Sequence, residues 1–132
     1  GFHQNGNAEF RNRFFFEIVG VHCPFGNTLV VAAPNEDSAA TGFSGDQDDD
    51  SALEAGAVYV YTRSGGAWTH QVYLKGSNTE QFDEFGSSVA LNQDGTVMAV
   101  GARFEDSAAV ELNNNETDNS VPDAGAVYVF MR

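Results

Sequence analysis

Apolar and polar residues alternate in short runs along most of this chain, with the two-residue period of β-strands. The clearest run is 68–75, in which alternation places one set of side chains on each face: Trp68, His70, Val72 and Leu74 on the first, Thr69, Gln71, Tyr73 and Lys75 on the second. Similar runs at 57–62, 87–91 and 96–102 are joined by turn signals such as Gln93-Asp94-Gly95. The pattern predicts an all-β protein with seven short strands, counting a poor first strand near 14–22.

The chain also repeats itself. Residues 26–63 and 95–132 align at a fixed offset of 69 without a gap, and 17 of the 38 aligned positions are identical. One unit has the expected order strand, tight turn, strand, long loop, strand, tight turn, strand. Four antiparallel strands per repeat are typical of a β-propeller blade, which must stack on its neighbours to bury its apolar faces.

This period divides the chain into about two blades. Residues 1–25 are expected to form a divergent N-terminal part of the first blade, 26–80 its repeat-like part, and 81–132 a second blade that lacks its last strand. A closed propeller needs about four to eight blades. The chain is therefore expected to be a piece of a longer protein or a subunit that associates with others.

Several tracts resemble the FG-GAP repeat. They are Phe85-Gly86-Ser87-Ser88-Val89-Ala90-Leu91, Asp94-Gly95, Ala99-Val100-Gly101-Ala102 and Ala124-Gly125-Ala126-Val127-Tyr128-Val129-Phe130. This is the repeat of the integrin α-subunit head propeller and of many bacterial secreted or surface proteins. The resemblance implies a propeller exposed outside the cell, with a role in adhesion or as a display scaffold.

One part of the family pattern is missing. The integrin-type calcium loop has the form D-x-D-x-D-G-x-x-D, and its positions fall here on Ala90, Asn92, Asp94, Gly95 and Met98. Ala90 and Met98 cannot bind calcium. The family's cation site therefore does not transfer to this position, which is expected to be a plain hairpin turn.

Charge is concentrated in three predicted loops. The chain has a net charge of −13, and 34–55, 76–86 and 103–124 hold 16 of its 19 acidic residues. Up-and-down strand order would place these loops on one face. Such a surface repels nucleic acid and anionic membranes, and no apolar run is long enough to span a bilayer. Cations, basic extracellular proteins, glycans or further blades are the expected partners.

The acidic loop at 46–54 is a candidate calcium site. Asp46, Asp48, Asp50 and Glu54 have the 1-3-5-9 spacing of a calcium loop, although Ser51 replaces the usual glycine at position six. The equivalent positions in the second copy are less charged: Asn115, Thr117, Asn119 and Asp123. The alternative is a solvated loop whose charge favours solubility.

The tract Glu36-Asp37-Ser38 returns as Glu105-Asp106-Ser107. One interpretation is a turn in which Asp and Ser side chains accept bonds from nearby N–H groups. The other adds Asp37 and Asp106 to the calcium ligands. Gly56 and Gly125 are expected to permit close approach of strands rather than to bind a ligand.

Catalysis has little support in the sequence. His3, His22 and His70 are not repeated, and no serine, nor the single cysteine Cys23, has a base and an orienting group nearby. The expected function is therefore that of a non-enzymatic extracellular or cell-surface repeat protein with a structural or adhesive role. Two alternatives remain: a subunit of a self-assembling filament or ring, and a propeller module that accompanies a secreted hydrolase acting on glycans or lipids.

Overall fold

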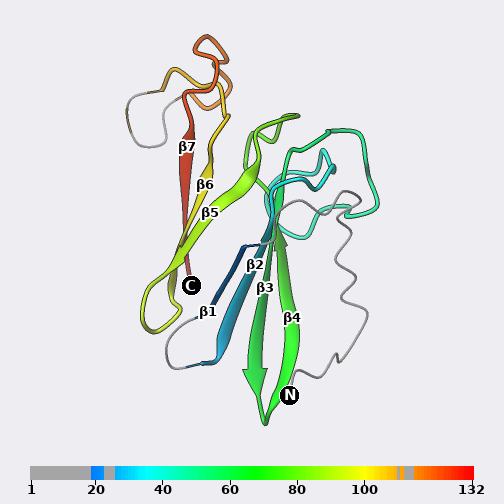
Figure 1. Ribbon diagram of the computed structural model, residues 1–132, viewed down its shortest axis with the longest axis vertical. Coiled ribbons are helices and arrows are strands. Elements are labelled where there is room, and N and C mark those ends of the chain that lie inside the picture. The colour runs from blue at the N-terminus through cyan, green and yellow to red at the C-terminus, as the bar shows by residue number, and fades with distance from the viewer. Residues whose placement is uncertain (1–18, 23–25, 110, 112–114) are drawn as a thin grey trace.

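The computed structural model describes residues 19–22, 26–109, 111 and 115–132, and the description of side chains begins at residue 26. The described part is all-β and contains no helix (Figure 1). Its strands are β1 Val19–His22, β2 Thr28–Ala33, β3 Ala57–Ser64, β4 Ala67–Leu74, β5 Phe85–Leu91, β6 Val97–Ala102 and β7 Ala126–Met131. The seven strands confirm the all-β prediction, and the part of the poor first strand at 14–18 lies outside the described residues.

The strands form two antiparallel sheets in chain order. The first sheet has the order β1-β2-β3-β4 and the second has the order β5-β6-β7. Within each sheet, strands that pair are also consecutive in the sequence. The connections between them alternate between tight turns and long loops. The proposed boundaries at 25/26 and 80/81 stay predictions.

The sequence repeat is also a structural repeat. Val30 lies opposite Val60 in the first sheet, and their copies Ala99 and Val129 lie opposite each other in the second. The same holds for Val31 with Tyr59 and for Val100 with Tyr128. β2 and β3 are therefore equivalent to β6 and β7.

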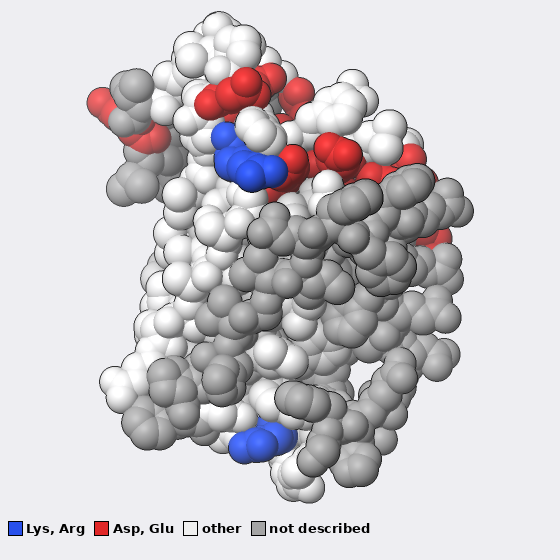
Figure 2. Space-filling model, in the orientation of Figure 1, with Lys and Arg blue, Asp and Glu red and all other residues white. Residues whose placement is uncertain are grey.

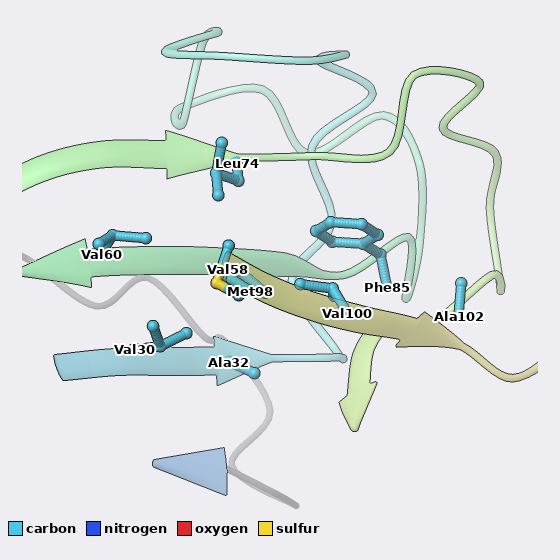
Figure 3. Close-up of a cluster of buried hydrophobic side chains, with 9 residues drawn as sticks. All are labelled: Val30, Ala32, Val58, Val60, Leu74, Phe85, Met98, Val100 and Ala102. Atoms are coloured by element: carbon cyan, nitrogen blue, oxygen red, sulfur yellow. The ribbon is translucent and has the colours of Figure 1, made fainter. Parts of the chain in front are cut away.

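The two sheets pack face to face through one apolar core (Figure 3). The first sheet contributes Val30, Ala32, Val58, Val60 and Leu74, and the second contributes Phe85, Met98, Val100 and Ala102. Burying each large apolar side chain stabilises the fold by roughly 1.5–3 kcal/mol. We call the side of the first sheet that carries Val58 and Val60 its valine face; the equivalent face of the second sheet carries Val127 and Val129.

The opposite side of the first sheet is aromatic. Tyr59, Tyr61 and Tyr73 are buried there with Val31 and Ala33. Burial raises the pKa of Tyr59 and Tyr73 above that of a free tyrosine. Each side of the sheet thus has its own apolar cluster, which explains why β3 is buried on both faces along its first five residues.

A bulge in the pairing of β3 with β4 corrects one prediction. Val60 lies opposite Val72 but Tyr61 lies opposite His70, so the register shifts at Gln71. An extra residue in one strand reverses the alternation on its far side. Val72 and Leu74 therefore join the valine face, whereas Trp68 and His70 lie with the tyrosines. The prediction that all four share one face was wrong.

Gly56, just before β3, permits a close approach to the start of β5. Its φ is +83°, and a Cβ atom placed there would lie 2.2 Å from the carbonyl oxygen of Phe85. Only glycine fits such an approach, which confirms the close-contact interpretation of this residue. No helix in the described residues is long and apolar enough to cross a membrane.

Candidate functional site

The three long connections lie together at one end of the molecule. They comprise residues 34–56, residues 75–84 and the described residues of 103–125, and we call this region the acidic end. The N–H of Phe82 donates to the carbonyl of Leu53 at 2.7 Å, and that of Phe104 donates to Asp83 at 3.4 Å. Figure 2 shows acidic side chains gathered there. The prediction that these loops share one face is confirmed for the described residues.

The acidic end is not only a solvated surface. Five of its carboxylate residues are buried: Glu36, Asp37, Asp83, Glu84 and Glu105. A buried carboxylate is costly unless it is hydrogen-bonded or paired. The bonds of these groups therefore indicate what holds the loops in place.

Asp37 and Ser38 hold the first long loop closed. Asp37 Oδ1 accepts a bond of 2.8 Å from the Glu54 N–H at the far end of the loop. Ser38 Oγ accepts from the Ala40 N–H at 3.0 Å and donates to the Asp46 carbonyl at 2.6 Å. These bonds agree with the turn interpretation of the tract.

The second copy makes the same bonds. Asp106 Oδ1 accepts from the Asp123 N–H at 2.7 Å, and Ser107 Oγ donates to the Asn115 carbonyl at 3.0 Å. Ser107 Oγ also accepts from the Ala109 N–H at 3.0 Å. The repeated polar residues are thus explained by a loop geometry that both copies share.

The proposed calcium ligands are near one another in the first loop but do not converge. Asp46 Oδ1 accepts from the Asp48 N–H at 2.9 Å, while Asp49 Oδ2 accepts from the Ala39 N–H at 2.9 Å. Asn119, in the weaker second set, donates to Glu80 at 2.7 Å. In the described part of the chain, no three His, Cys, Asp or Glu side chains are placed to hold a metal ion. Calcium would require carboxylates of this loop to rearrange, and its binding stays a prediction.

The integrin-type position is an ordinary hairpin turn. Asp94 Oδ1 accepts from the Thr96 N–H at 3.1 Å, and Asn92 Oδ1 accepts from the Val97 N–H at 2.9 Å. The hydroxyl of Thr96 holds the pKa of the exposed Asp94 below its ordinary value. These side chains close the turn between β5 and β6 at the end opposite the acidic end.

A buried ion pair is the feature that the sequence analysis missed. Lys75 Nζ lies 2.7 Å from Glu36 Oε2, with the two side chains 0% and 2% exposed. The Tyr73 hydroxyl donates to Glu36 Oε1 at 2.8 Å, so both carboxylate oxygens are bonded. Burial lowers the pKa of Lys75, and the Glu36 charge opposes that shift. One signal was available: Lys75 is the only lysine, at the end of an alternating strand.

Glu105 occupies the position equivalent to Glu36 but has different partners. Its Oε1 accepts from Asn78 Nδ2 at 2.9 Å and its Oε2 accepts from the Ser107 N–H at 3.0 Å. No Lys or Arg among the described residues forms an ion pair with it. Glu105 is 3% exposed, so its negative charge is buried without a cation.

The negative charge of Glu105 affects the pKa of a neighbouring carboxyl group. Burial raises the pKa of Asp83 to about 6, the bond from the Glu80 N–H opposes the rise, and the charge of Glu105 adds to it. Asp83 Oδ2 accepts that bond at 2.9 Å. Asp83 and Glu105 therefore repel each other at the acidic end when both are ionised.

A groove of about 600 Å³ opens beside these groups. Its wall includes residues of β7 from both faces of the strand, together with Phe43, Asn78 and Glu105. β7 pairs only with β6 in the described structure and is an edge strand. The groove thus follows an edge whose backbone groups are available for pairing.

The described histidine is packed rather than placed for catalysis. His70 lies 5.3 Å from the ring of Tyr61 and 6.2 Å from that of Tyr59, centroid to centroid. Its Nε2 is buried without a hydrogen-bond partner. The side chains of His3, His22 and Cys23 lie outside the described residues. The expectation of a non-enzymatic protein stays a prediction.

Residues 68–130 match the family model of the FG-GAP repeat. The match begins in β4 and ends in β7, so it covers the motif tracts and confirms the resemblance. Phe85, at the start of the motif, is buried in the core, and Gly86 lies against Ala32 and Ala57. These motif residues join the two sheets. Neither the curated proteins nor the solved structures include one that matches the chain.

Proposed function

We propose that this chain, in which residues 68–130 form an FG-GAP repeat, is an extracellular, non-enzymatic repeat module with a structural or adhesive role. Its two sheets would be neighbouring blades of a β-propeller, the second without its last strand. The family match supports this assignment, because the FG-GAP repeat is a module of extracellular and adhesion proteins.

The observation that carries the proposal is the stacking of two repeat-related sheets. The valine face of the first sheet is buried against the second. The equivalent residues of the second sheet are open: Val127 is 71% exposed and Val129 is 59% exposed. Burial of this face in one repeat and exposure of the equivalent face in the next are typical of a repeat array with further units.

The acidic end is the surface we assign to a partner. Asp48, Asp50 and Glu80 are exposed there. A protein partner that docks on them would present Arg or Lys, and its affinity would fall with ionic strength. A glycan held through a bridging divalent cation would instead be released by EDTA.

Self-assembly into a filament or ring is the second candidate function. The open valine face of the second sheet favours it, since a heterologous contact repeated between identical subunits produces a ring or a filament. The module accompanying a secreted hydrolase has no comparable observation in its favour and stays a prediction.

Two measurements test the proposal. A tagged protein on intact source cells should be digested by added protease, whereas a tag that is protected until lysis would contradict the extracellular location. A printed array of glycans and matrix proteins should then bind the chain. D48N/D50N/E80Q should lose that binding, and D94N, which removes charge at the opposite end, should retain it. Equal binding by both variants would contradict the role of the acidic end.

A further inference from the structure

We propose that the groove beside β7 binds an extended segment of the β4 type, in which a lysine follows a tyrosine by two residues and pairs with Glu105. The segment would add a fourth strand to the second sheet. The molecule has two equivalent places for such a segment, and only one of them is filled. Such binding rests on the proposed role of the chain as one module of a longer repeat array, but not on the extracellular location.

The first sheet shows the filled place. β4 pairs with β3 so that Leu74 lies opposite Val58 and Tyr73 lies opposite Tyr59. The next residue, Lys75, reaches Glu36. β4 and the residue that follows it thus supply both the edge pairing and the two side chains that bond the buried carboxylate.

The second sheet repeats everything except that strand. β7 is the copy of β3, and Glu105 is the copy of Glu36. A segment in the register of β4 would place leucine opposite Val127 and tyrosine opposite Tyr128. Its lysine would then stand at Glu105, as Lys75 stands at Glu36.

The groove has the chemistry that such a segment needs. Glu105 lines it as a buried carboxylate, and Val127 and Val129 line it as apolar positions. Lys75 also lines the groove, but its ammonium is paired with Glu36, and no described Lys or Arg pairs with Glu105. Asn78 now bonds both Glu105 and the Tyr128 hydroxyl, with 2.5 Å between Asn78 Oδ1 and the hydroxyl. An amide neutralises no charge, so a lysine would add an electrostatic gain that Asn78 cannot provide.

The occupant is a segment of a further repeat and not β4 of a second copy. In a second copy, Tyr73 and Lys75 are already buried against their own Glu36. Exchanging one carboxylate for another would gain nothing and would open the first sheet. A further repeat with the same pattern brings its own tyrosine and lysine.

A peptide with the sequence of residues 67–76, added to the full chain, tests this. Binding is measured by fluorescence anisotropy, and amide hydrogen exchange reports where the peptide lies. We expect slower exchange in β7 with the peptide bound, because edge pairing protects amides. Replacing the peptide's lysine by methionine should weaken binding about tenfold. The same replacement should change little against Glu105→Gln, as a double-mutant cycle requires for a direct pair.

Each other result counts against the proposal. An equal loss with the wild-type chain and E105Q, or exchange protection outside β7, would overturn it. So would a peptide of scrambled sequence that binds as well, or an absence of binding at millimolar peptide. If circular dichroism shows that E105Q does not fold, the proposal is tested on the wild-type chain alone. The test is then the difference in affinity between the lysine and methionine peptides, together with the protection of β7 from exchange. Self-association of the chain that protects β7 from exchange and excludes the peptide would assign the groove to a second copy.

Discussion

The ammonium of Lys75 and the carboxylate of Glu36 form an ion pair of 2.7 Å that has almost no contact with solvent. It joins the end of β4 to the loop that follows β2, across 39 residues of sequence. Because Tyr73 bonds the other carboxylate oxygen, Glu36 connects the three side chains in one network. The pair therefore connects the acidic end to the edge of the first sheet.

Removing Lys75 should destabilise the fold strongly. Lys75→Met leaves Glu36 as a buried, uncompensated charge, and we expect a loss of about 3–5 kcal/mol in the free energy of unfolding. Urea denaturation followed by fluorescence measures it. E36Q/K75M should lose less than K75M alone, since it leaves no buried charge.

An ion pair with one exposed partner provides the control. Arg103 lies 2.6 Å from Glu84, but its side chain is 56% exposed. We expect Arg103→Gln to cost no more than about 1 kcal/mol. Similar losses for K75M and R103Q would show that burial does not govern the strength of the first pair.

Gly56→Ala should loosen the contact between the sheets. The added Cβ would lie 2.2–2.9 Å from backbone atoms of Phe85, and the φ of +83° is unfavourable for alanine. We expect a loss of more than about 3 kcal/mol, measured by urea denaturation. Gly65→Ala is the control, because its φ of +58° is also positive and nothing lies within 4 Å. It should cost about 1 kcal/mol, and equal losses would contradict the steric argument.

Asp83 should make stability depend on pH. Its folded-state pKa of about 6 is above the ordinary value of 3.8, so the folded state binds this proton more tightly than the unfolded state. The stabilisation is complete below about pH 4 and is lost as pH rises through about 6. Asp83→Asn removes this loss, so the stability of the variant relative to wild type should improve by about 1–2 kcal/mol between pH 4 and pH 7, allowing for solvent screening.

Asp94→Asn is the control for that measurement. The pKa of Asp94 is lowered, so its contribution is present above its ordinary pKa and is lost as pH falls. The pH trend of this variant should therefore have the opposite sign. A D83N stability that runs parallel to wild type across the range would show that Asp83 titrates normally.

Calcium should stabilise the chain only at millimolar concentration. The carboxylates of 46–54 must first rearrange, and weak extracellular calcium modules have dissociation constants of about 0.1–1 mM. At ten times such a constant, mass action adds about 1.4 kcal/mol, which is visible as a rise in Tm. D46N/D48N/D50N should abolish the rise, and D94N should keep it. An unchanged Tm in wild type at about 20 mM calcium would remove the calcium prediction.

Much of the fold could be predicted because local patterns determine it. Two-residue alternation and turn residues located β3, β4, β5 and β6, and the 69-residue offset revealed the equivalence of the sheets. The failure came at Gln71, where a bulge reversed the faces of Trp68 and His70. Nothing in the alternation of β4 itself marks that bulge. It depends on how β4 meets β3, which is a property of the pair of strands.

The candidate site was predicted less well than the fold. The repeated tract Glu36-Asp37-Ser38 was recognised, and the bonds of Asp37 and Ser38 follow from short-range turn chemistry. Glu36 differs, because its partners lie 37 and 39 residues away. Such pairing needs the sheet topology and the burial, which only the folded chain provides. The spacing of Asp46, Asp48 and Asp50 can be read from the local sequence, but the direction of each side chain depends on how the loop folds.

Burial of the only lysine has a practical consequence for chemical labelling. Amine-reactive reagents need a deprotonated, accessible ε-amino group, and Lys75 is 1% exposed and bonded to Glu36. Modification of Lys75, read by peptide mass spectrometry, would therefore occur only when the end of β4 opens. The rate of acylation at this one residue would report the opening of the first sheet, without any engineered probe.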